Sequence, residues 1–161
     1  MQLSAACLEA LVAGNLDAAS AHAGQPLTPY LVDEAWLWRM RLEQLAKDPS
    51  SLGWIARAAV DTTDSEVVGH VGFHGPPDER GMVEVAYAVD PARRRQGYAT
   101  SMLATALGWA AGSSDVEVVR ASISPGNKAS LATIAHFGFE QVGTQWDEED
   151  GLELLFERTA R

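Results

Sequence analysis

The sequence predicts a mixed α/β (α+β) fold in which a central, mostly antiparallel twisted sheet carries helices on both faces. Two observations lead to this prediction. Apolar residues before position 50 recur with helical spacing and are punctuated by Gly and Pro. From residue 54 onward, β-rich segments joined by turns give way to the order helix–strand–helix–strand–strand. The 161 residues suffice for one sizeable core, so residues 1–161 are interpreted as a single domain.

Two short helices are predicted at the start of the chain. Ser4 is suited to cap the first helix, which ends at Gly14. Asn15 is suited to cap the second helix, which ends at Gly24. The segment 25–29 contains two prolines and is expected to break the chain before the next element.

A longer helix is predicted over residues 31–47, because Asp48-Pro49 stops it. Its apolar residues form one stripe at i, i+4, i+7, i+11 and i+14, namely Leu31, Ala35, Trp38, Leu42 and Leu45. The charged residues Arg39, Arg41 and Glu43 stand between them. The stripe is expected to pack on the sheet rather than to bind a partner.

Strands follow in the middle of the chain. Residues 54–60 and 67–73 are predicted strands that flank a hairpin turn over 61–65. A loop over 75–78, with two prolines, leads to a third strand over 82–89. This order predicts an antiparallel meander.

The second half alternates helix and strand. The predicted elements are a helix over 98–111 ended by Gly112, a strand over 116–123, a helix over 128–137 closed by Gly138-Phe139, a strand from 139, a turn over 147–151 and a last strand over 152–156.

Composition limits the classes of function. The net charge of −10 disfavours nucleic-acid binding, which needs Lys and Arg against phosphates, and it suits either a cationic substrate or a well-solvated surface. Cys7 is the only cysteine, so no intrachain disulfide forms and a cytoplasmic location is expected. No apolar run approaches the ~20 residues that span a bilayer, and no leader peptide is expected.

The segment 83–100 carries the main chemical signal. A β-rich strand stops at Asp90-Pro91, and a basic turn with Arg93, Arg94 and Arg95 leads directly to Gly97 and a helix. The start of a helix offers unpaired N–H groups and partial positive charge, and glycine allows close approach, so this turn suits a phosphate or pyrophosphate. An exposed basic loop before an ordinary helix is the alternative. The chain contains neither Gly-x-x-x-x-Gly-Lys-Ser/Thr nor Gly-x-Gly-x-x-Gly, which disfavours a P-loop or Rossmann cofactor.

These residues also resemble a known family. Arg94-Arg95-Gln96-Gly97-Tyr98-Ala99 resembles the Arg/Gln-x-x-Gly-x-Gly/Ala pyrophosphate loop of GNAT-type N-acetyltransferases. The segment from Asn127 through Ser130 to Gly138-Phe139 resembles the Asn-x-x-Ser…Gly-Phe segment of the same superfamily, and residues 69–78 resemble the hairpin entry of many bacterial members. The similarity spans roughly residues 54–157 and is nearest to the branch that includes the ribosomal-protein N-terminal acetyltransferases, with only a loose match over the first fifty residues.

The resemblance implies the GNAT fold and acetyl-CoA as cosubstrate, without a metal. It assigns the pantetheine arm to the backbone of Tyr87, Ala88 and Val89 and a further coenzyme contact to Asn127. It assigns the pyrophosphate to Arg94, Arg95, Gln96, Gly97, Tyr98, Ala99 and Thr100. Residues 54–157 would then bind acetyl-CoA, and residues 1–50 would form a helical acceptor-side region. Asn127 also suits a helix N-cap, which requires no ligand.

Transfer of the acetyl group requires an acceptor for the amine proton, because an alkyl amine is protonated at neutral pH. Glu84 is the first candidate, acting through water, since it is a carboxylate inside the apolar strand that leads to the thioester. An edge-facing glutamate or an arginine partner is the alternative interpretation of Glu84. His74 is the second candidate for the base. His70 and His74 share a strand face, but no further ligands accompany them, so no metal site is predicted.

The proton donor for the leaving thiolate is less defined. Many GNAT enzymes carry a tyrosine seven residues after the helix-start asparagine, where this chain has Ile134. Ser130 is a candidate to orient the sulfur or relay a proton, although a hydroxyl bonded within its own helix is the alternative. A thiolate, whose thiol has a pKa of about 8.5, can also leave without a dedicated acid. Ser101 stands where close relatives often carry glutamate, so a substrate contact made by that glutamate is not expected in this chain.

The predicted function is acetyl transfer from acetyl-CoA to a primary amine, either a small molecule or a peptide N-terminus. A catalytically silent coenzyme-A-binding or regulatory module is the alternative from another class. An amine-specific resistance enzyme would differ only in its acceptor. No membrane partner is expected, and a homodimer stays open.

Overall fold

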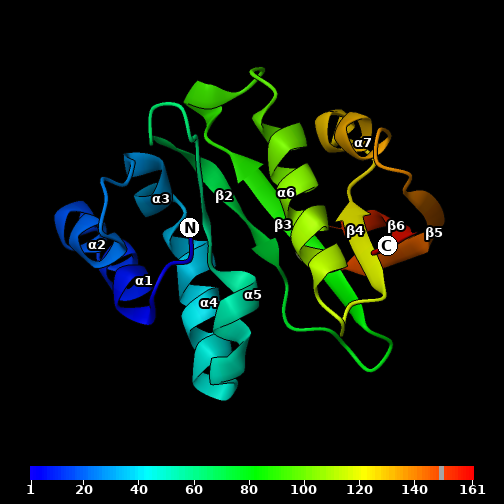
Figure 1. Cartoon of the computed structure of the whole chain (residues 1–161), viewed down its shortest axis with the longest axis horizontal. Coiled ribbons are helices and arrows are strands. Elements are labelled where there is room, and N and C mark those ends of the chain that lie inside the picture. Colours follow the sequence, from blue (N-terminus) through cyan, green and yellow to red (C-terminus); the bar gives the residue numbers. More distant parts are fainter. Residues whose placement is uncertain (149–150) are drawn as a thin grey trace.

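The computed structural model describes residues 1–148 and 151–161, and its central element is a six-stranded sheet in the order β1-β2-β3-β4-β6-β5 (Figure 1). The strands are β1 (Ala58–Val60), β2 (Val67–Phe73), β3 (Met82–Val89), β4 (Val118–Ile123), β5 (Glu140–Asp147) and β6 (Gly151–Thr159). All neighbouring strands are antiparallel except β3 and β4, which are parallel. The predicted mixed, mostly antiparallel sheet is therefore confirmed.

Helices cover both faces of this sheet. They are α1 (Ala5–Val12), α2 (Leu16–Ala23), α3 (Pro29–Asp33), α4 (Ala35–Lys47), α5 (Leu52–Ile55), α6 (Tyr98–Gly112) and α7 (Lys128–Ile134), with single 3₁₀ turns at Pro49–Ser51 and Pro91–Arg93. Successive side chains of a strand point to opposite faces. On β2, His70 meets Trp38 of α4 on one face, and Phe73 meets Trp109 of α6 on the other.

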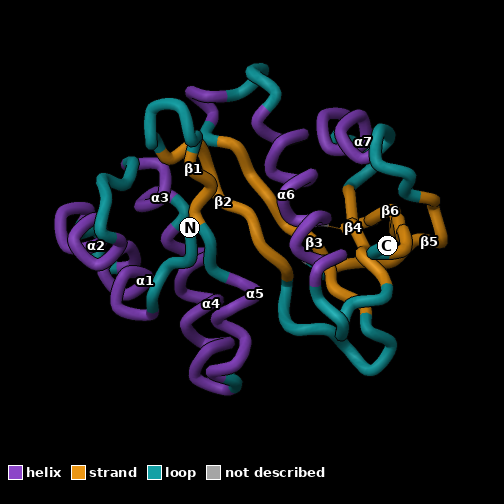
Figure 2. The backbone as a smooth tube through the Cα atoms, viewed as in Figure 1, coloured by secondary structure: helices purple, strands orange, loops and turns teal. Residues whose placement is uncertain are grey.

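The apolar interior consists of two clusters. One lies among α1 to α5 and the first two strands, and includes Leu8, Leu31 and Trp38. The other lies between α6, α7 and the strands β3 and β4, and includes Val83 and Leu103. The N-terminal helices gather at the β1 end of the sheet, and the β5–β6 hairpin lies at the opposite end (Figure 2). Val85, Ala121 and Ile123 of the second cluster also line the cavity between the far ends of β3 and β4, where the site described below is found.

Several of the predicted element boundaries are confirmed, whereas β4 begins at Val118 rather than at 116, α7 ends at Ile134 rather than at 137, and β6 runs to Thr159 rather than to 156. The Ser4 hydroxyl accepts a hydrogen bond from the Cys7 amide and caps α1, and the Asn15 side chain caps α2, which ends at a left-handed Gly24. Strands β2 and β3 have the predicted bounds. Helix α6 begins at Tyr98 as predicted and includes Gly112. Of the predicted turn over 147–151, Glu149 and Asp150 lie outside the described residues.

The predicted helix over 31–47 is wrong as a continuous element, because Glu34 interrupts it between α3 and α4. The indole N–H of Trp38 donates to the carbonyl oxygen of Leu31 at 2.5 Å. In an unbroken helix that carbonyl would accept from the amide four residues later, so a side chain takes the place of a helical bond. Arg41, which the stripe placed among the polar residues, is instead buried.

The predicted strand over 54–60 is also wrong in its first half, because Trp54 lies in α5 and only Ala58–Val60 is strand. The Asp48 carboxylate accepts hydrogen bonds from the Ser50 amide and from the hydroxyls of Ser50 and Ser51. This cap starts a new helical stretch immediately after α4. Asp48-Pro49 therefore ends one helix and begins the next.

Gly69 on β2 allows the close contact between β2 and β3, and Gly69→Ala is expected to lower the free energy of unfolding by about 2 to 3 kcal/mol. A Cβ at this position would lie 2.1 Å from the Ala88 carbonyl oxygen and 2.9 Å from Met102 Cε. Chemical denaturation followed by circular dichroism measures the change. Gly108→Ala is the control, since no atom lies within 4 Å of its Cβ and alanine favours the helix by about 1 kcal/mol. A Gly69→Ala protein as stable as the wild type would contradict this account of the contact.

Candidate active site

A cavity of about 400 Å³ opens where β3 and β4 part. The two strands pair only from Met82–Val118 to Glu84–Arg120, although β3 continues to Val89 and β4 to Ile123. The polar residues that line the cavity come from β3, β4, β5, β6 and α7, from the end of β2 and from the loop before α7, and include Glu84, Tyr87, Ser122, Asn127, Ser130 and Glu153. The structure thus brings together both predicted catalytic residues, Glu84 and Ser130, with Tyr87 and Asn127.

The pairing of β3 with β2 determines which backbone groups face this cavity. The His74 amide donates to the Glu84 carbonyl at 2.8 Å, and the Asp90 amide donates to the Val68 carbonyl at 2.9 Å. Because backbone groups along a strand alternate between its two neighbours, Ala88 also faces β2, whereas Tyr87 and Val89 face away from it. Of the three residues predicted for the pantetheine arm, Tyr87 and Val89 therefore turn their backbone groups to the open side of β3, beyond the β3–β4 pairing.

Glu84 lies at the point where the pairing ends, beside the histidine that was the second candidate base. Its carboxylate is 3.5 Å from Nδ1 of His74, and the Glu84 side chain is 18% exposed whereas the His74 side chain is 55% exposed. Partial burial of the imidazole lowers the pKa of His74, and the nearby Arg41 guanidinium acts in the same direction, whereas the carboxylates of Glu84 and Glu153 oppose them. The two candidate bases thus form one pair rather than two separate sites.

His70 is placed differently from His74, although the two share the predicted strand face. Its ring stacks on Tyr30 and meets the edge of Trp38. Burial, and then the charge of Arg41, lower the pKa of His70 to about 4. His70 is therefore a neutral, packed imidazole outside the cavity.

Two buried hydroxyl groups lie at the cavity without a hydrogen-bond partner among the described residues, those of Tyr87 and Ser122. The hydroxyls of Ser130 and Thr133 approach Tyr87 from α7 but do not reach hydrogen-bond geometry. Burial raises the pKa of Tyr87, with those two hydroxyls acting in the opposite direction. A buried hydroxyl without a partner costs free energy, so these groups are suited to a bound molecule. From the sequence, the Tyr87 side chain could be either a packing residue of the sheet or a contact to substrate, and a role for its hydroxyl in proton transfer was not predicted.

Asn127 and Ile134 lie on α7 and its cap. The Asn127 side chain accepts a hydrogen bond from the Ser130 amide at 3.1 Å and so caps this helix, while it also lines the cavity. Both interpretations of Asn127 therefore stay open. Ile134 is buried in the core at the position where a tyrosine acid was sought.

The loop before α6 presents an uncapped helix start. Gly97 has a φ of 85° and no side chain caps the helix, so the first amides of α6 lack intrahelical partners. Arg95 also has a positive φ, of 64°. Arg93 pairs with Glu66, and Arg94 Nε donates to the Val89 carbonyl at 3.3 Å. The residues predicted to hold the pyrophosphate all lie in this loop and the first turn of α6, as Arg94, Arg95, Gln96, Gly97, Tyr98, Ala99 and Thr100.

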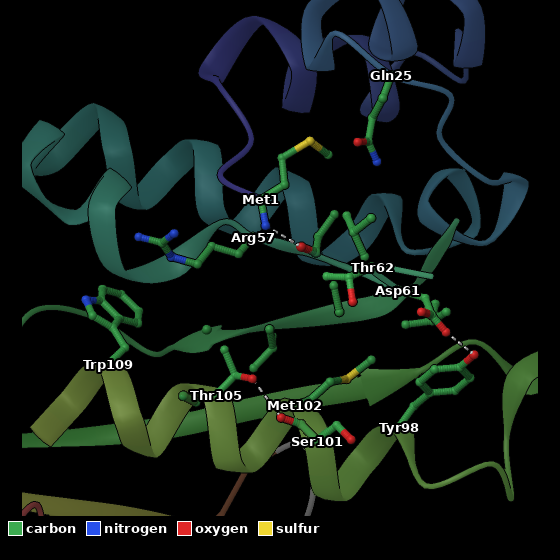
Figure 3. A pocket seen from close by; sticks show the side chains of 17 residues that line it. Met1, Gln25, Arg57, Asp61, Thr62, Tyr98, Ser101, Met102, Thr105 and Trp109 are labelled. Carbon is green, nitrogen blue, oxygen red and sulfur yellow. Dashed lines mark hydrogen bonds between the residues drawn. The ribbon is translucent and has the colours of Figure 1, made fainter. Parts of the chain in front are cut away.

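The Tyr98 side chain points away from this loop, toward a second and larger cavity of about 700 Å³ between β1 and α6 (Figure 3). Its hydroxyl donates to the Asp61 carboxylate at 2.7 Å, which ties the start of α6 to the β1–β2 turn. The predicted catalytic residues do not line this cavity, whose walls include Val60, Met102 and Trp109. Ser101 lies on its edge as well (Figure 3). Of the predicted site residues, only Tyr98 faces this second cavity.

Comparison with known proteins gives a consistent result. A family model described as an acetyltransferase (GNAT) domain matches residues 3–140, including residues 3–50, where the sequence resemblance was loose. An uncharacterized N-acetyltransferase of Bacillus subtilis, YjdG, is 32% identical over 97 residues, which cover 60% of this chain and 58% of that protein. The match therefore spans less than two thirds of that relative.

Solved structures with the same fold include two acetyltransferases. The ribosomal-protein-alanine N-acetyltransferase of Brucella melitensis is 26% identical, covers 99% of this chain and 98% of its own, and has a TM-score of 0.61. A GNAT superfamily phosphinothricin acetyltransferase of Sinorhizobium meliloti, in complex with AcCoA, is 17% identical, covers 99% of this chain and 86% of its own, and has a TM-score of 0.63.

Proposed function

Since the chain belongs to the GNAT acetyltransferase family, we propose that it transfers an acetyl group from acetyl-CoA to a primary amine by direct attack on the thioester. The family and the fold class predicted from the sequence are both confirmed. The observation that carries the proposal is the opening between β3 and β4, because there the backbone edge of β3 that no strand covers lies next to a carboxylate–imidazole pair. We further propose that residues 54–157 bind acetyl-CoA and residues 1–50 form the acceptor side.

The arrangement suits acetyl-CoA at both ends of the site. The uncapped start of α6, with Arg94 and Arg95 beside Gly97, offers amides and positive charge to a pyrophosphate. The backbone edges of Tyr87 and Val89 can extend the sheet by pairing with the amides of a pantetheine arm. Asn127 and the unpartnered hydroxyl of Ser122 are further polar groups that line the same cavity. No metal enters this proposal.

The chemistry follows from the residues around the opening. Glu84, with His74 beside it, accepts the proton of the incoming ammonium through water, so the neutral amine can attack the thioester carbonyl. Free backbone amides at the strand edge can stabilise the tetrahedral oxyanion. The C–S bond then breaks, and the departing sulfur takes a proton. The Tyr87 hydroxyl is a donor for that proton, with Ser130 orienting the sulfur or relaying the proton.

Tyr87→Phe is expected to lower kcat roughly 10- to 100-fold while coenzyme A binding is retained. The melting temperature is expected to stay level or rise, because a buried hydroxyl without a partner is removed. Steady-state kinetics and differential scanning calorimetry measure the two effects. Tyr30→Phe, on the opposite side of β2, is the matched control. An unchanged kcat in Tyr87→Phe would show that the thiolate leaves without this donor.

The cavity wall suggests a cationic acceptor. Its lining includes the carboxylates of Glu84 and Glu153, and no Lys or Arg among the described residues. We therefore propose a small-molecule amine or a peptide N-terminus as acceptor, each positively charged before deprotonation. A cytoplasmic location is also proposed, since the sole cysteine, Cys7, is a buried free thiol, and a homodimer stays open.

The proposed function is tested by acetyl-CoA-dependent thiol release against peptides, polyamines and aminoglycosides. We expect release with at least one of these classes, and acetylated amine detected by mass spectrometry. Isothermal titration calorimetry with coenzyme A accompanies the screen. Binding without release on any amine would favour the alternative, a catalytically silent coenzyme-A-binding module. Absence of both binding and release would contradict the proposal and the alternative together.

A further inference from the structure

Arg41 is a buried cation on α4, directly behind the candidate base. Its exposed fraction is 6%. Its Nη1 donates to Gln44 Oε1 at 3.0 Å and to the main-chain carbonyl of His74 at 3.3 Å. Gln44 Nε2 donates to the same carbonyl at 2.7 Å. Two side chains of one helix therefore converge on the carbonyl of the residue that follows β2.

Arg41 has no carboxylate to balance its charge. None of the ion pairs within residues 1–148 and 151–161 includes it. Its Nε is buried and lacks a hydrogen-bond partner there. Burial of this kind lowers the pKa of Arg41 and disfavours its charged form. An apolar side chain of similar length would fill the same space without this cost, so packing does not explain the arginine.

The charge of Arg41 faces the pair at the end of β2. His74 Nδ1 lies 3.5 Å from the Glu84 carboxylate of β3, and Glu153 of β6 lines the same cavity. These two carboxylates favour a protonated imidazole, whereas partial desolvation of the imidazole, which is 55% exposed, and Arg41 of α4 favour a neutral one and lower the pKa of His74. Without Arg41, only partial burial of the imidazole would counteract the two carboxylates, which raise the pKa of His74.

Resting on the proposed acetyl transfer, we propose that Arg41 is a positioning residue, which with Gln44 anchors the His74 carbonyl and keeps the imidazole beside Glu84 in a form that can accept a proton. The ammonium group of the acceptor can then lose its proton, through water, to the His74–Glu84 pair. Arg41 itself touches neither acceptor nor thioester in this proposal. Its effect passes through His74.

The first test is a histidine titration that requires no catalysis. In Arg41→Met, the midpoint of His74 measured by NMR is expected to move to higher pH, because one of the groups that oppose protonation is removed. The His74 signal is assigned by its loss in His74→Asn. Arg39→Met is the matched control, since Arg39 is an exposed arginine on the same helix. In Arg39→Met, the titration midpoint of His74 is expected to equal that of the wild type. The exposed His22 and His136 serve as internal references.

The second test is the pH dependence of acetyl transfer. If the neutral imidazole is required, the acidic limb of kcat/KM in Arg41→Met moves to higher pH, and activity at the acid end falls by roughly tenfold. Gln44→Ala is expected to lower kcat by roughly tenfold without moving the acidic limb of kcat/KM. The reason is that one hydrogen bond to the His74 carbonyl is lost while the positive charge of Arg41 is kept. Arg41→Lys keeps a positive charge and is expected to restore much of the limb position.

The two tests separate this inference from the proposed function. An unmoved His74 midpoint in a folded Arg41→Met overturns the inference, whether or not the protein acetylates an amine. A moved midpoint with no acetyl transfer in the wild type overturns the proposed function and leaves the effect of Arg41 on His74 standing. A merely structural arginine would lower the melting temperature and leave both pH profiles unmoved, which also contradicts the inference. We expect a folded Arg41→Met, because replacing a buried charge by an apolar side chain is often neutral for stability.

Discussion

Glu84→Gln is expected to lower kcat by roughly 100-fold while acetyl-CoA still binds. Glutamine keeps the size and hydrogen-bonding reach of the side chain but cannot accept the ammonium proton. The carboxylate lies where β3 and β4 part, with His74 Nδ1 at 3.5 Å, so its loss leaves the imidazole without its partner. The acidic limb of the kcat/KM profile is expected to change as well, because the group or pair that titrates has been altered.

Steady-state kinetics over a range of pH and calorimetric titration with coenzyme A measure the effects of Glu84→Gln. Glu140→Gln is the control, since Glu140 is an exposed glutamate on β5 outside the cavity lining. Should the pH–rate profile of Glu84→Gln match the wild type, Glu84 would not be the base. His74→Asn would then be the variant to measure, because its imidazole is the other half of the pair.

Gly97→Phe is expected to weaken coenzyme A binding by roughly 100-fold or more while the fold is largely kept. Any side chain at Gly97 would stand at the uncapped start of α6, where the proposed site requires the backbone to approach the pyrophosphate closely. Loss of two hydrogen bonds to a charged group accounts for an effect of about 3 kcal/mol or more, which corresponds to that change in Kd. Isothermal titration calorimetry with coenzyme A measures it.

The control for Gly97→Phe must carry the same backbone strain at a distance from the site. Gly24 meets this condition, since its φ is 73° against 85° for Gly97, and no atom lies within 4 Å of either Cβ. Each substitution is expected to lower the free energy of unfolding by about 1 to 2 kcal/mol, the cost of a left-handed residue with a side chain. Only Gly97→Phe should affect binding. Equal, unchanged affinities in both variants would refute the pyrophosphate loop assigned to this segment.

Local signals account for the parts of the structure that the sequence predicted well. Ser4 and Asn15 bond to amides three residues away, and the left-handed Gly24 ends α2 within its own turn. The order strand, Asp90-Pro91, basic turn and Gly97 before α6 is likewise contained in a few neighbouring residues. Interactions of this range depend little on the rest of the chain, so residue type and spacing predict them.

The predictions that failed concern residues whose conformation depends on contacts with distant parts of the chain. Where the expected long helix is interrupted, the Trp38 indole donates a hydrogen bond to the Leu31 carbonyl. Arg41, expected to be a polar surface residue of α4, instead donates to the main-chain carbonyl of His74, the residue after β2. Neither event follows from apolar spacing, because each depends on what packs against the helix. Asp48 is an exception, since its capping of Ser50 was visible in the sequence as Asp-Pro-Ser-Ser and was interpreted only as a stop.

The sequence by itself determined the family resemblance, the element order and the loop at Gly97, because each is written in contiguous residues. Only the tertiary structure decided that β3 and β4 part after Glu84, that Ala88 turns its backbone to β2 while Tyr87 and Val89 do not, and that Arg41 lies behind His74. Strand register and side-chain burial result from pairing and packing between segments far apart in the chain. Such contacts cannot be predicted from the residue pattern of either segment alone.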